Sequence, residues 1–257
     1  MTFSSGKPLI VSLEGNIGAG KSTLLRKFQE WYDQQDHGAE PRWVFLYEPV
    51  ETWNTFCDSD GNTMLQKFYS DPVKYAFSFQ VMAYVTRLKE LETLLEAHPH
   101  CAGVLCERSL LADHEIFAKM LHDDGTLEDV LYQIYNQFVD KTVDRASIDG
   151  VVYVHAPVDV CIERISQRAR EGESDISKVY LQRCEDYHTA WLLSTEKPCT
   201  FPILRIDTTP GEQGFPSWIE KVNEFLHNMG TGYTTHSGSK GSSSMASSSL
   251  LYEEERR

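Results

Sequence analysis

Eight residues near the start of the chain have the types and the spacing that bind nucleotide phosphates. The segment 15–22 reads GNIGAGKS and matches the pattern G-x-x-x-x-G-K-S. Its glycines allow consecutive backbone N–H groups to turn toward phosphate oxygens, and the N-terminus of a following helix adds partial positive charge. Lys21 is placed to reach the β- and γ-phosphates, and the hydroxyl of Ser22 is placed to bind Mg²⁺. The segment therefore predicts a nucleoside triphosphate site.

The residues that flank this segment predict the strand and the helix that would position it. Residues 9–13 are mostly apolar, as expected of a buried strand, and residues 23–28 open an amphipathic helix. Strand, glycine-rich loop and helix in this order are the context that a phosphate-binding P-loop requires. A glycine turn that merely joins a strand to a helix is the plain alternative. The full pattern, however, arises by chance in only about 1 of 100 chains of this length.

Charged side chains also follow two other predicted strands. Glu48 follows a strand predicted over 42–47, and Glu107 and Arg108 follow a strand predicted over 103–106. Ligands of open α/β sheets bind at the carboxyl ends of the strands. We therefore expect these three side chains to lie beside the P-loop.

A long helix predicted over 73–97 carries polar residues in an apolar setting. Gln80, Ala83 and Arg87 are three and four residues apart and therefore share one face of this helix. Such residues usually point to solvent, but their neighbours in the sequence are too apolar for an exposed surface. We expect this face to line a pocket.

Arginines gather near the end of a helix predicted over 157–169. Arg164, Arg168 and Arg170 are followed by a polar connection. A solvated helix end would explain them, but in a P-loop protein such a segment is typical of a lid, because each guanidinium can bind phosphate oxygens bidentately.

Strands and helices alternate along the chain, which predicts an α/β fold. The strands are predicted over 9–13, 42–47, 103–106, 151–155 and 201–206, and helices over 73–97, 111–122, 126–145, 157–169, 176–195 and 215–229. This order is typical of a five-stranded parallel sheet with helices on both faces, the three-layer arrangement of P-loop NTPases. From residue 230 the sequence turns to glycine and serine with a charged end. We predict one folded domain over 1–229 and a disordered tail over 230–257.

Composition and charge argue against several classes of partner. The formal net charge of −14 speaks against a nucleic-acid backbone as partner, because such binding depends on clustered Lys and Arg. No run approaches the ~18 apolar residues of a membrane helix. Six scattered cysteines without a C-x-x-C pair favour free thiols in a reducing compartment over disulfides or a zinc site. The short stretch before the first strand leaves no room for a targeting peptide, so we expect a cytoplasmic protein.

With these stretches in place, the chain resembles the deoxyribonucleoside kinase family, in its branch of deoxycytidine, deoxyguanosine and deoxyadenosine kinases. The resemblance covers about residues 8–229. It rests on five stretches, namely 14–23, Glu48-Pro49-Val50 with Trp53, Phe79-Gln80, Glu107-Arg108-Ser109 with Asp113, and the arginines Arg164, Arg168 and Arg170. It implies transfer of the γ-phosphate of ATP, with Mg²⁺, to the 5′-hydroxyl of a deoxyribonucleoside in nucleotide salvage. It also implies a homodimer, for which the helices over 73–97 and 126–145 are candidates.

The resemblance implies a role for each matching residue. Glu48 would be the general base for the 5′-hydroxyl, and Arg108 would hold the 5′-oxygen and keep Glu48 ionised. Glu107 would share Mg²⁺ with Ser22, and Lys21 and the lid arginines would stabilise the transferring phosphoryl group. The implied ATP site comprises Gly15, Asn16, Ile17, Gly18, Ala19, Gly20, Lys21, Ser22, Thr23, Arg164, Arg168, Arg170 and Asp207. The implied nucleoside site comprises Glu48, Trp53, Leu65, Phe68, Tyr69, Phe79, Gln80, Ala83, Arg87, Arg108, Asp113, Phe117 and Glu173.

Within the nucleoside site, the resemblance separates base contacts from sugar contacts. Gln80 resembles the amide that reads the Watson–Crick edge of the base, inside an apolar slot. Tyr69 and Glu173 match the pair that holds the sugar 3′-hydroxyl, which favours deoxyribose with a free 3′-oxygen.

Substrate choice depends on a predicted arginine–aspartate pair beside the base. Arg87 and Asp113 would crowd the methyl group of thymine and offer hydrogen bonds to cytosine or a purine, so we expect thymidine to be rejected. The lid residues 167–171 most resemble those of deoxyguanosine kinases, whereas Ala83 follows the deoxycytidine pattern. We predict a purine-leaning enzyme for deoxyguanosine and deoxyadenosine, with deoxycytidine as a further candidate.

Two other functions stay open on the sequence alone. A nucleoside monophosphate kinase also has a P-loop and an arginine-rich lid, but it would need additional basic residues for the phosphate of its acceptor. The predicted pocket offers Glu48, Gln80 and Tyr69 instead, which suit a neutral nucleoside. A non-catalytic structural subunit with a kinase-like fold, as occurs in a respiratory complex, would be expected to lack Lys21, Glu48 or the lid arginines, and all of these are present.

Overall fold

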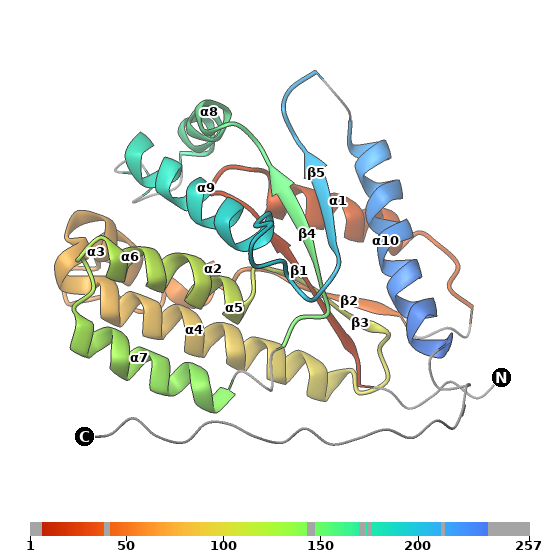
Figure 1. Cartoon of the computed structure of the whole chain (residues 1–257), viewed down its shortest axis with the longest axis horizontal. Helices are drawn as coiled ribbons and strands as arrows, with labels where there is room; N and C mark the ends of the chain where they lie inside the picture. The colour runs from red at the N-terminus through yellow and green to blue at the C-terminus, as the bar shows by residue number, and fades with distance from the viewer. Residues whose placement is uncertain are drawn as a thin grey trace.

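A parallel sheet of five strands forms the centre of the protein (Figure 1). The computed structural model describes residues 7–38, 42–142, 147–169, 173, 176–211 and 214–235. The strand order is β2-β3-β1-β4-β5, with bounds Trp43–Leu46, Gly103–Glu107, Leu9–Glu14, Gly150–His155 and Ile203–Asp207. All neighbouring strands pair in parallel. The predicted α/β fold with a parallel sheet is therefore confirmed.

Strand β1 lies at the middle of the sheet, and all six of its residues are buried. Because successive side chains of a strand point to opposite faces, Leu9 and Val11 pack with one layer of helices and Ile10 packs with the other. The first layer contains α1 (Lys21–Tyr32) and α10 (Phe215–Thr235). The second contains α4 (Pro72–Ala97), α7 (Asp129–Thr142) and the end of α9 (Lys178–Leu192). Two apolar faces on every central strand thus require helices on both sides.

Several helices differ from the predicted ranges. Helix α10 continues to Thr235, six residues beyond its predicted end at 229, and the remainder of the predicted tail, 236–257, lies outside the described residues. The region between β2 and α4, for which no element is predicted, contains α2 (Val50–Trp53) and α3 (Met64–Ser70). Helix α3 begins with a capping box between Thr63 and Gln66, a signal that is visible in the sequence.

The helix predicted over 111–122 is divided into three short pieces. These are α5 (Leu110–Ala112), a π-helical turn η1 (Asp113–Ala118) and α6 (Lys119–Asp123). A π-helical turn inserts extra backbone into a helix and is often found at functional sites. Here it changes the direction in which the side chains of residues 113–118 project.

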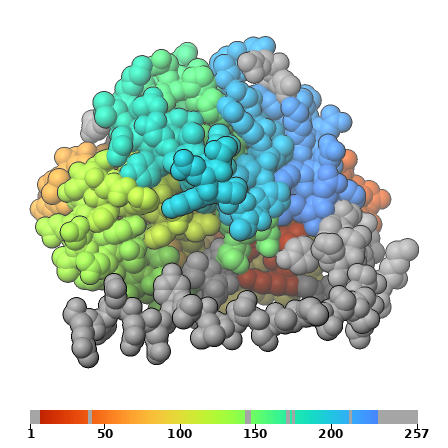
Figure 2. All heavy atoms as spheres, in the orientation of Figure 1, coloured from red at the N-terminus to blue at the C-terminus, as the bar shows by residue number. Residues whose placement is uncertain are grey.

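The remaining helices and the surface complete the frame. Helix α8 spans Val158–Arg168 and connects β4 to the arginine-rich segment. In Figure 2, α9 and the loop after it (cyan) cover the space between α7 (green) and α10 (blue). Among the described residues, no helix is long and apolar enough to cross a membrane.

Candidate active site

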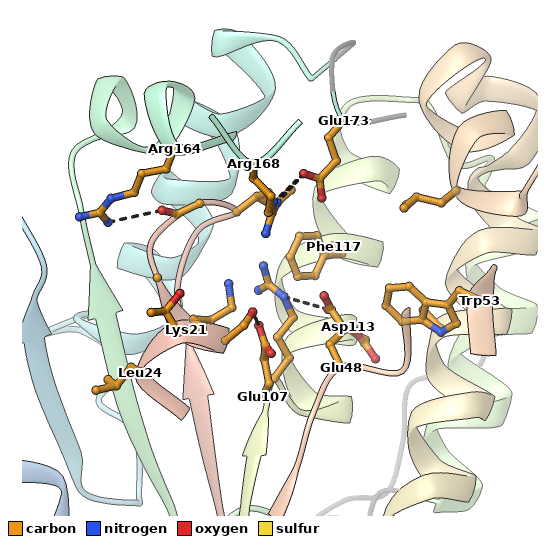
Figure 3. Close-up of a pocket in the computed structure, with 18 of the residues that line it drawn as sticks. Lys21, Leu24, Glu48, Trp53, Glu107, Asp113, Phe117, Arg164, Arg168 and Glu173 are labelled. Atoms are coloured by element: carbon orange, nitrogen blue, oxygen red, sulfur yellow. Dashed lines mark hydrogen bonds and ion pairs between the residues drawn. The ribbon is translucent and has the colours of Figure 1, made fainter. Parts of the chain in front are cut away.

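A cavity of about 700 Å³ lies at the carboxyl ends of the strands (Figure 3). It extends from the P-loop to α4, and residues that are far apart in the sequence line it. Most of the residues predicted for the ATP and nucleoside sites lie on its wall. The exceptions are Gly15, Asn16, Ala19, Phe68 and Asp207, which do not line it, and Arg170, which lies outside the described residues.

The five exceptions support the site from behind. Gly15 has φ +144°, and a Cβ atom there would lie 2.0 Å from the Val154 carbonyl oxygen, so only glycine fits. The Asn16 amide donates to the Leu181 carbonyl at 2.8 Å, and Ala19 is fully buried. The Phe68 ring stacks on the outer face of Phe79, with centroids 4.5 Å apart and planes 9° apart. The Asp207 carboxylate accepts from Thr209 and pairs with His155.

Lys21 is held inside the P-loop. Its ammonium group donates to the carbonyl oxygens of Gly15 at 3.1 Å and Asn16 at 2.9 Å. Burial lowers the pKa of Lys21 to about 8, and the charge of Arg108 acts in the same direction. A buried cation held only by neutral carbonyls is well placed to bind phosphate oxygens, because their negative charge compensates its desolvation.

Ser22 and Glu107 bring two oxygen ligands together at the other side of the loop. The Ser22 hydroxyl donates to Glu107 Oε1 at 2.6 Å. Magnesium prefers oxygen ligands and is usually held by one or two carboxylates, phosphate oxygens and water rather than by a full protein cage. The two side chains therefore fit a magnesium ion that also binds the phosphates. Such an ion would neutralise negative charge on the phosphate chain.

Glu48 lies between two arginines. Its Oε1 is 3.3 Å from Arg87 Nη2 and 3.4 Å from Arg108 Nε. Burial alone would raise the pKa of Glu48, but the charges of Arg108, Arg87 and Lys21 outweigh it and hold the pKa below its ordinary value. Glu48 is therefore a carboxylate at neutral pH, which is the state that a base requires.

The turn after β3 places Arg108 under backbone strain. Arg108 has φ +64°, in the left-handed region that non-glycine residues rarely adopt, and this costs about 1–3 kcal/mol. Its guanidinium lies 4.6 Å from the centroid of the Phe117 ring. The next residue, Ser109, caps α5 and donates to the buried Glu14 carboxylate at 2.6 Å. These contacts hold the arginine toward Glu48 in spite of the strain.

A buried ion pair lies beside Glu48 in the wall of the cavity. Arg87 Nε donates to Asp113 Oδ2 at 3.0 Å, and Arg87 Nη1 donates to the Glu107 carbonyl at 2.8 Å. Both side chains are 4% exposed. Burial raises the pKa of Asp113, and Arg87 opposes that rise. The π-helical turn η1 carries both Asp113 and Phe117, and nothing in the sequence pattern indicates this turn.

Aromatic rings form a slot beside this pair. The Trp53 and Phe79 rings meet edge to face at 5.8 Å, and Trp53 Nε1 donates to Thr86 Oγ1 at 2.8 Å. The carbonyl oxygen of Gln80 has no hydrogen-bond partner among the described residues. A ligand in the slot can therefore orient the Gln80 amide through a hydrogen bond to this oxygen.

The two described lid arginines have different surroundings. Arg164 donates to the P-loop carbonyl of Ala19 at 3.1 Å and to the Thr208 carbonyl at 2.6 Å, so it ties the P-loop to the end of β5. Arg168 donates from Nε and Nη2 to Glu173 Oε2 (Figure 3). The sequence resemblance does not distinguish these two settings.

Some cavity residues are absent from the predicted set. Tyr180 lines the cavity beside Tyr69, and the two rings meet edge to face with their centroids 6.4 Å apart. The P-loop side also includes Leu24, Gln167, Thr208, Phe215 and Trp218. Gln167 lies in the arginine-rich segment directly before Arg168, so its place in the sequence could have identified it. Tyr180 and Trp218 lie on helices distant in sequence from the P-loop, and no local pattern marks them.

Fold and site together define a P-loop phosphotransferase, with a phosphate cradle at one end of the cavity and a carboxylate between arginines next to it. The sequence profile of the deoxynucleoside kinase family matches residues 11–227. The chain therefore belongs to the deoxynucleoside kinase family and is a kinase. This family membership confirms the predicted resemblance.

Named relatives agree with this assignment. A probable deoxycytidine kinase of Fowlpox virus (strain NVSL) is 35% identical over 223 residues, which are 85% of this chain and 86% of that protein. The mitochondrial deoxyguanosine kinase of Xenopus laevis is 30% identical over 225 residues, 79% of this chain and 81% of that protein. The deoxycytidine kinase of Homo sapiens is 28% identical over 237 residues, 85% and 91% of the two chains.

Proposed function

We propose that the protein transfers the γ-phosphate of ATP, with Mg²⁺, to the 5′-hydroxyl of deoxycytidine and of purine deoxyribonucleosides, and that it rejects thymidine. The observation that carries this proposal is the buried Arg87–Asp113 pair in the wall of the same cavity that the P-loop lines. The names of the relatives support both substrate classes, since they include deoxycytidine and deoxyguanosine kinases.

The proposed reaction uses the groups in the order in which they line the cavity. The 5′-oxygen forms a bond to the γ-phosphorus while the bond to the β–γ bridging oxygen breaks, and the proton of the 5′-hydroxyl passes to Glu48. Arg108 stabilises the 5′-oxygen, and its ion pair with Glu48 keeps the base ionised. Lys21 stabilises the charge of the phosphate chain. Ser22 and Glu107 would hold Mg²⁺.

Base selection follows from hydrogen-bonding groups around the slot. Asp113 is an acceptor held in place by Arg87, so it favours the exocyclic amino group of cytosine or adenine. Arg87 offers donors that suit the carbonyl oxygen of guanine. Thymine presents a carbonyl oxygen next to a methyl group. The carbonyl would give the second oxygen of Asp113 no donor, and the methyl group would collide with the ion pair.

Phosphorylation of the four natural deoxyribonucleosides with ATP and Mg²⁺ tests the proposal. We expect kcat/KM for deoxycytidine and for at least one purine deoxyribonucleoside to exceed that for thymidine by at least about 100-fold, because a rejected base leaves buried polar groups unpaired. Preferential use of thymidine would contradict the proposal. The predicted preference for purines over deoxycytidine stays a prediction, and the order of the same kcat/KM values decides it.

Deoxynucleoside monophosphates are the control substrates in this assay. The arginines at the acceptor end, Arg87 and Arg108, are already paired with Asp113 and Glu48, which disfavours an acceptor that carries a phosphate. Turnover of dCMP or dTMP in place of the nucleosides would identify a monophosphate kinase. Absence of turnover with ATP still bound would favour a structural subunit.

The outer surface of α4 and α7 supports a homodimer. Val130, Ile134 and Phe138 lie four residues apart on α7, so they form one apolar stripe, and they are 57%, 44% and 47% exposed. Tyr84 of α4 contacts α7 through its hydroxyl, 2.6 Å from Thr142, so the two helices present one continuous surface (Figure 1). We propose that a second copy of the chain covers this stripe.

A charge placed on the stripe is expected to separate the copies. Phe138→Asp should weaken self-association at least 30-fold, because a buried aromatic contact in an interface contributes about 2 kcal/mol or more. Sedimentation or light scattering across a dilution series measures the effect. Val179→Asp is the matched control, since Val179 is 73% exposed on α9, outside the stripe. Unchanged association of the Phe138 variant would place the interface elsewhere.

A further inference from the structure

An ion pair connects the sugar side of the cavity to the phosphate side. Arg168, the last residue of α8, donates to Glu173 Oε2 from Nε at 3.1 Å and from Nη2 at 2.5 Å. The Glu173 side chain is 5% exposed, whereas that of Arg168 is 35% exposed, and both line the cavity. A carboxylate buried to this degree requires hydrogen-bond donors, and Arg168 supplies two.

This ion pair engages one edge of the Arg168 guanidinium, and the other edge is directed away from Glu173. Glu173 engages the edge formed by Nε and Nη2, and an arginine has five N–H donors in a planar fork. Figure 3 shows Arg168 between Glu173 and the centre of the site, with the dashed contact on its Glu173 side and Lys21 below. A guanidinium clamped at one edge loses less side-chain entropy when its other edge binds phosphate oxygens.

Glu173 also faces the sugar side. Its negative charge acts on the Tyr69 hydroxyl and contributes, after burial, to raising the pKa of Tyr69. A carboxylate accepts at two oxygens with about four positions, so a second donor is compatible with the ion pair. A phenol and a carboxylate that face one cavity suit a sugar hydroxyl, which donates to one and accepts from the other.

We propose that Glu173 is a positioning residue that orients Arg168 toward the transferring phosphate, and that a sugar hydroxyl bound by Glu173 completes this orientation. Occupancy of the sugar site is then transmitted to the phosphate side through one side-chain contact. The inference rests on the proposed kinase activity and deepens it. Glu173 would affect turnover as well as nucleoside binding.

A double-mutant cycle tests the connection. We expect Glu173→Gln to lower kcat about tenfold in the wild-type background, because the amide keeps a hydrogen bond to the sugar but no longer holds the guanidinium through charge. In the Arg168→Met background the same change should alter kcat less than twofold, since its effect passes through Arg168. Equal losses of kcat in both backgrounds, or an effect on the nucleoside KM alone, would overturn the proposal.

The substrate supplies a second measurement that needs no change at Glu173. The 3′-deoxy analogue of the fastest natural substrate should lower kcat of the wild-type enzyme about fivefold or more, and should lower kcat of Arg168→Met less than twofold. An analogue that raises KM in both enzymes and leaves kcat unchanged would contradict the inference.

A matched control variant and the natural substrates separate failure of the proposed kinase function from failure of the proposed role of Glu173. Asp159 lies on α8, the helix that ends at Arg168, and forms an exposed ion pair with Lys178. Asp159→Asn removes this carboxylate and should leave kcat unchanged. If the wild-type enzyme phosphorylates no deoxyribonucleoside, the proposed function fails. If it phosphorylates them and the cycle is additive, only the role of Glu173 fails.

Discussion

Replacement of Glu48 by glutamine is expected to lower kcat by about 10³-fold, within the range that a positioned general base contributes. Glutamine keeps the size of the side chain and one acceptor oxygen but cannot take the proton of the 5′-hydroxyl. Nucleoside affinity should change less than about fivefold, the equivalent of one neutral hydrogen bond. Steady-state kinetics together with calorimetric binding of the nucleoside separate the two quantities.

A neighbouring carboxylate and the pH profile serve as controls for this variant. Glu51 is exposed on α2, three residues after Glu48, and Glu51→Gln should leave kcat unchanged. Because Arg108 and Arg87 hold the pKa of Glu48 below its ordinary value, Glu48 stays ionised as the pH falls from 8 to 5, and the wild-type kcat/KM should show no loss from Glu48 over that range. Turnover of Glu48→Gln close to that of the wild type would remove Glu48 from the role of base.

Replacement of both members of the buried pair is expected to change the base preference. In Arg87→Met with Asp113→Ala, the cavity loses the acceptor for an exocyclic amino group and gains room for a methyl group. The ratio of kcat/KM for thymidine to that for deoxycytidine should rise at least about 10³-fold, because rejection through unpaired polar groups is the strongest form of discrimination. Competition between the two nucleosides in one assay measures the ratio, and continued rejection of thymidine would show that other groups select the base.

The single variants distinguish a charge effect from general damage to the cavity. Arg87→Met alone leaves the Asp113 carboxylate buried without its ion-pair partner, which costs about 3–5 kcal/mol of the free energy of unfolding. The double variant removes both charges and should be more stable than this single variant. Glu48 keeps its contact with Arg108 in both proteins. Thermal unfolding compares them, and a double variant that is less stable than Arg87→Met would contradict this account.

The sequence by itself was sufficient for those parts of the protein that local chemistry determines. The P-loop could be predicted because its glycines, Lys21 and Ser22 act within one short segment, between a strand and a helix. The start of α4 could be predicted because Asp71 caps the helix through its own side chain, and Pro72 suits the first position. The parallel sheet could be predicted because its strands, apolar on both faces, alternate with amphipathic helices.

Matching stretches in the sequence resemblance also identified most of the cavity wall, but not its contacts. The predicted nucleoside site included Phe68, whose ring lies behind Phe79 and does not line the cavity. The predicted lid treated Arg164 as equivalent to Arg168, although Arg164 is tied to the P-loop and to the end of β5. Which atom meets which depends on the direction of side chains on separate helices, and a pattern of residue types does not contain that direction.

Only the tertiary structure decided the features on which the chemistry depends. The pairing of Arg168 with Glu173 is a side-chain contact that the pattern of residue types does not specify. The π-helical turn that carries Asp113 and Phe117 and the left-handed backbone of Arg108 are local conformations that their own sequence does not favour. They persist because contacts from elsewhere in the chain outweigh local preference, as when Arg87 of α4 holds Asp113 and the buried Glu14 of β1 holds Ser109. Long-range contacts of this kind exist only after the strands and helices have assembled, so they are properties of the fold as a whole.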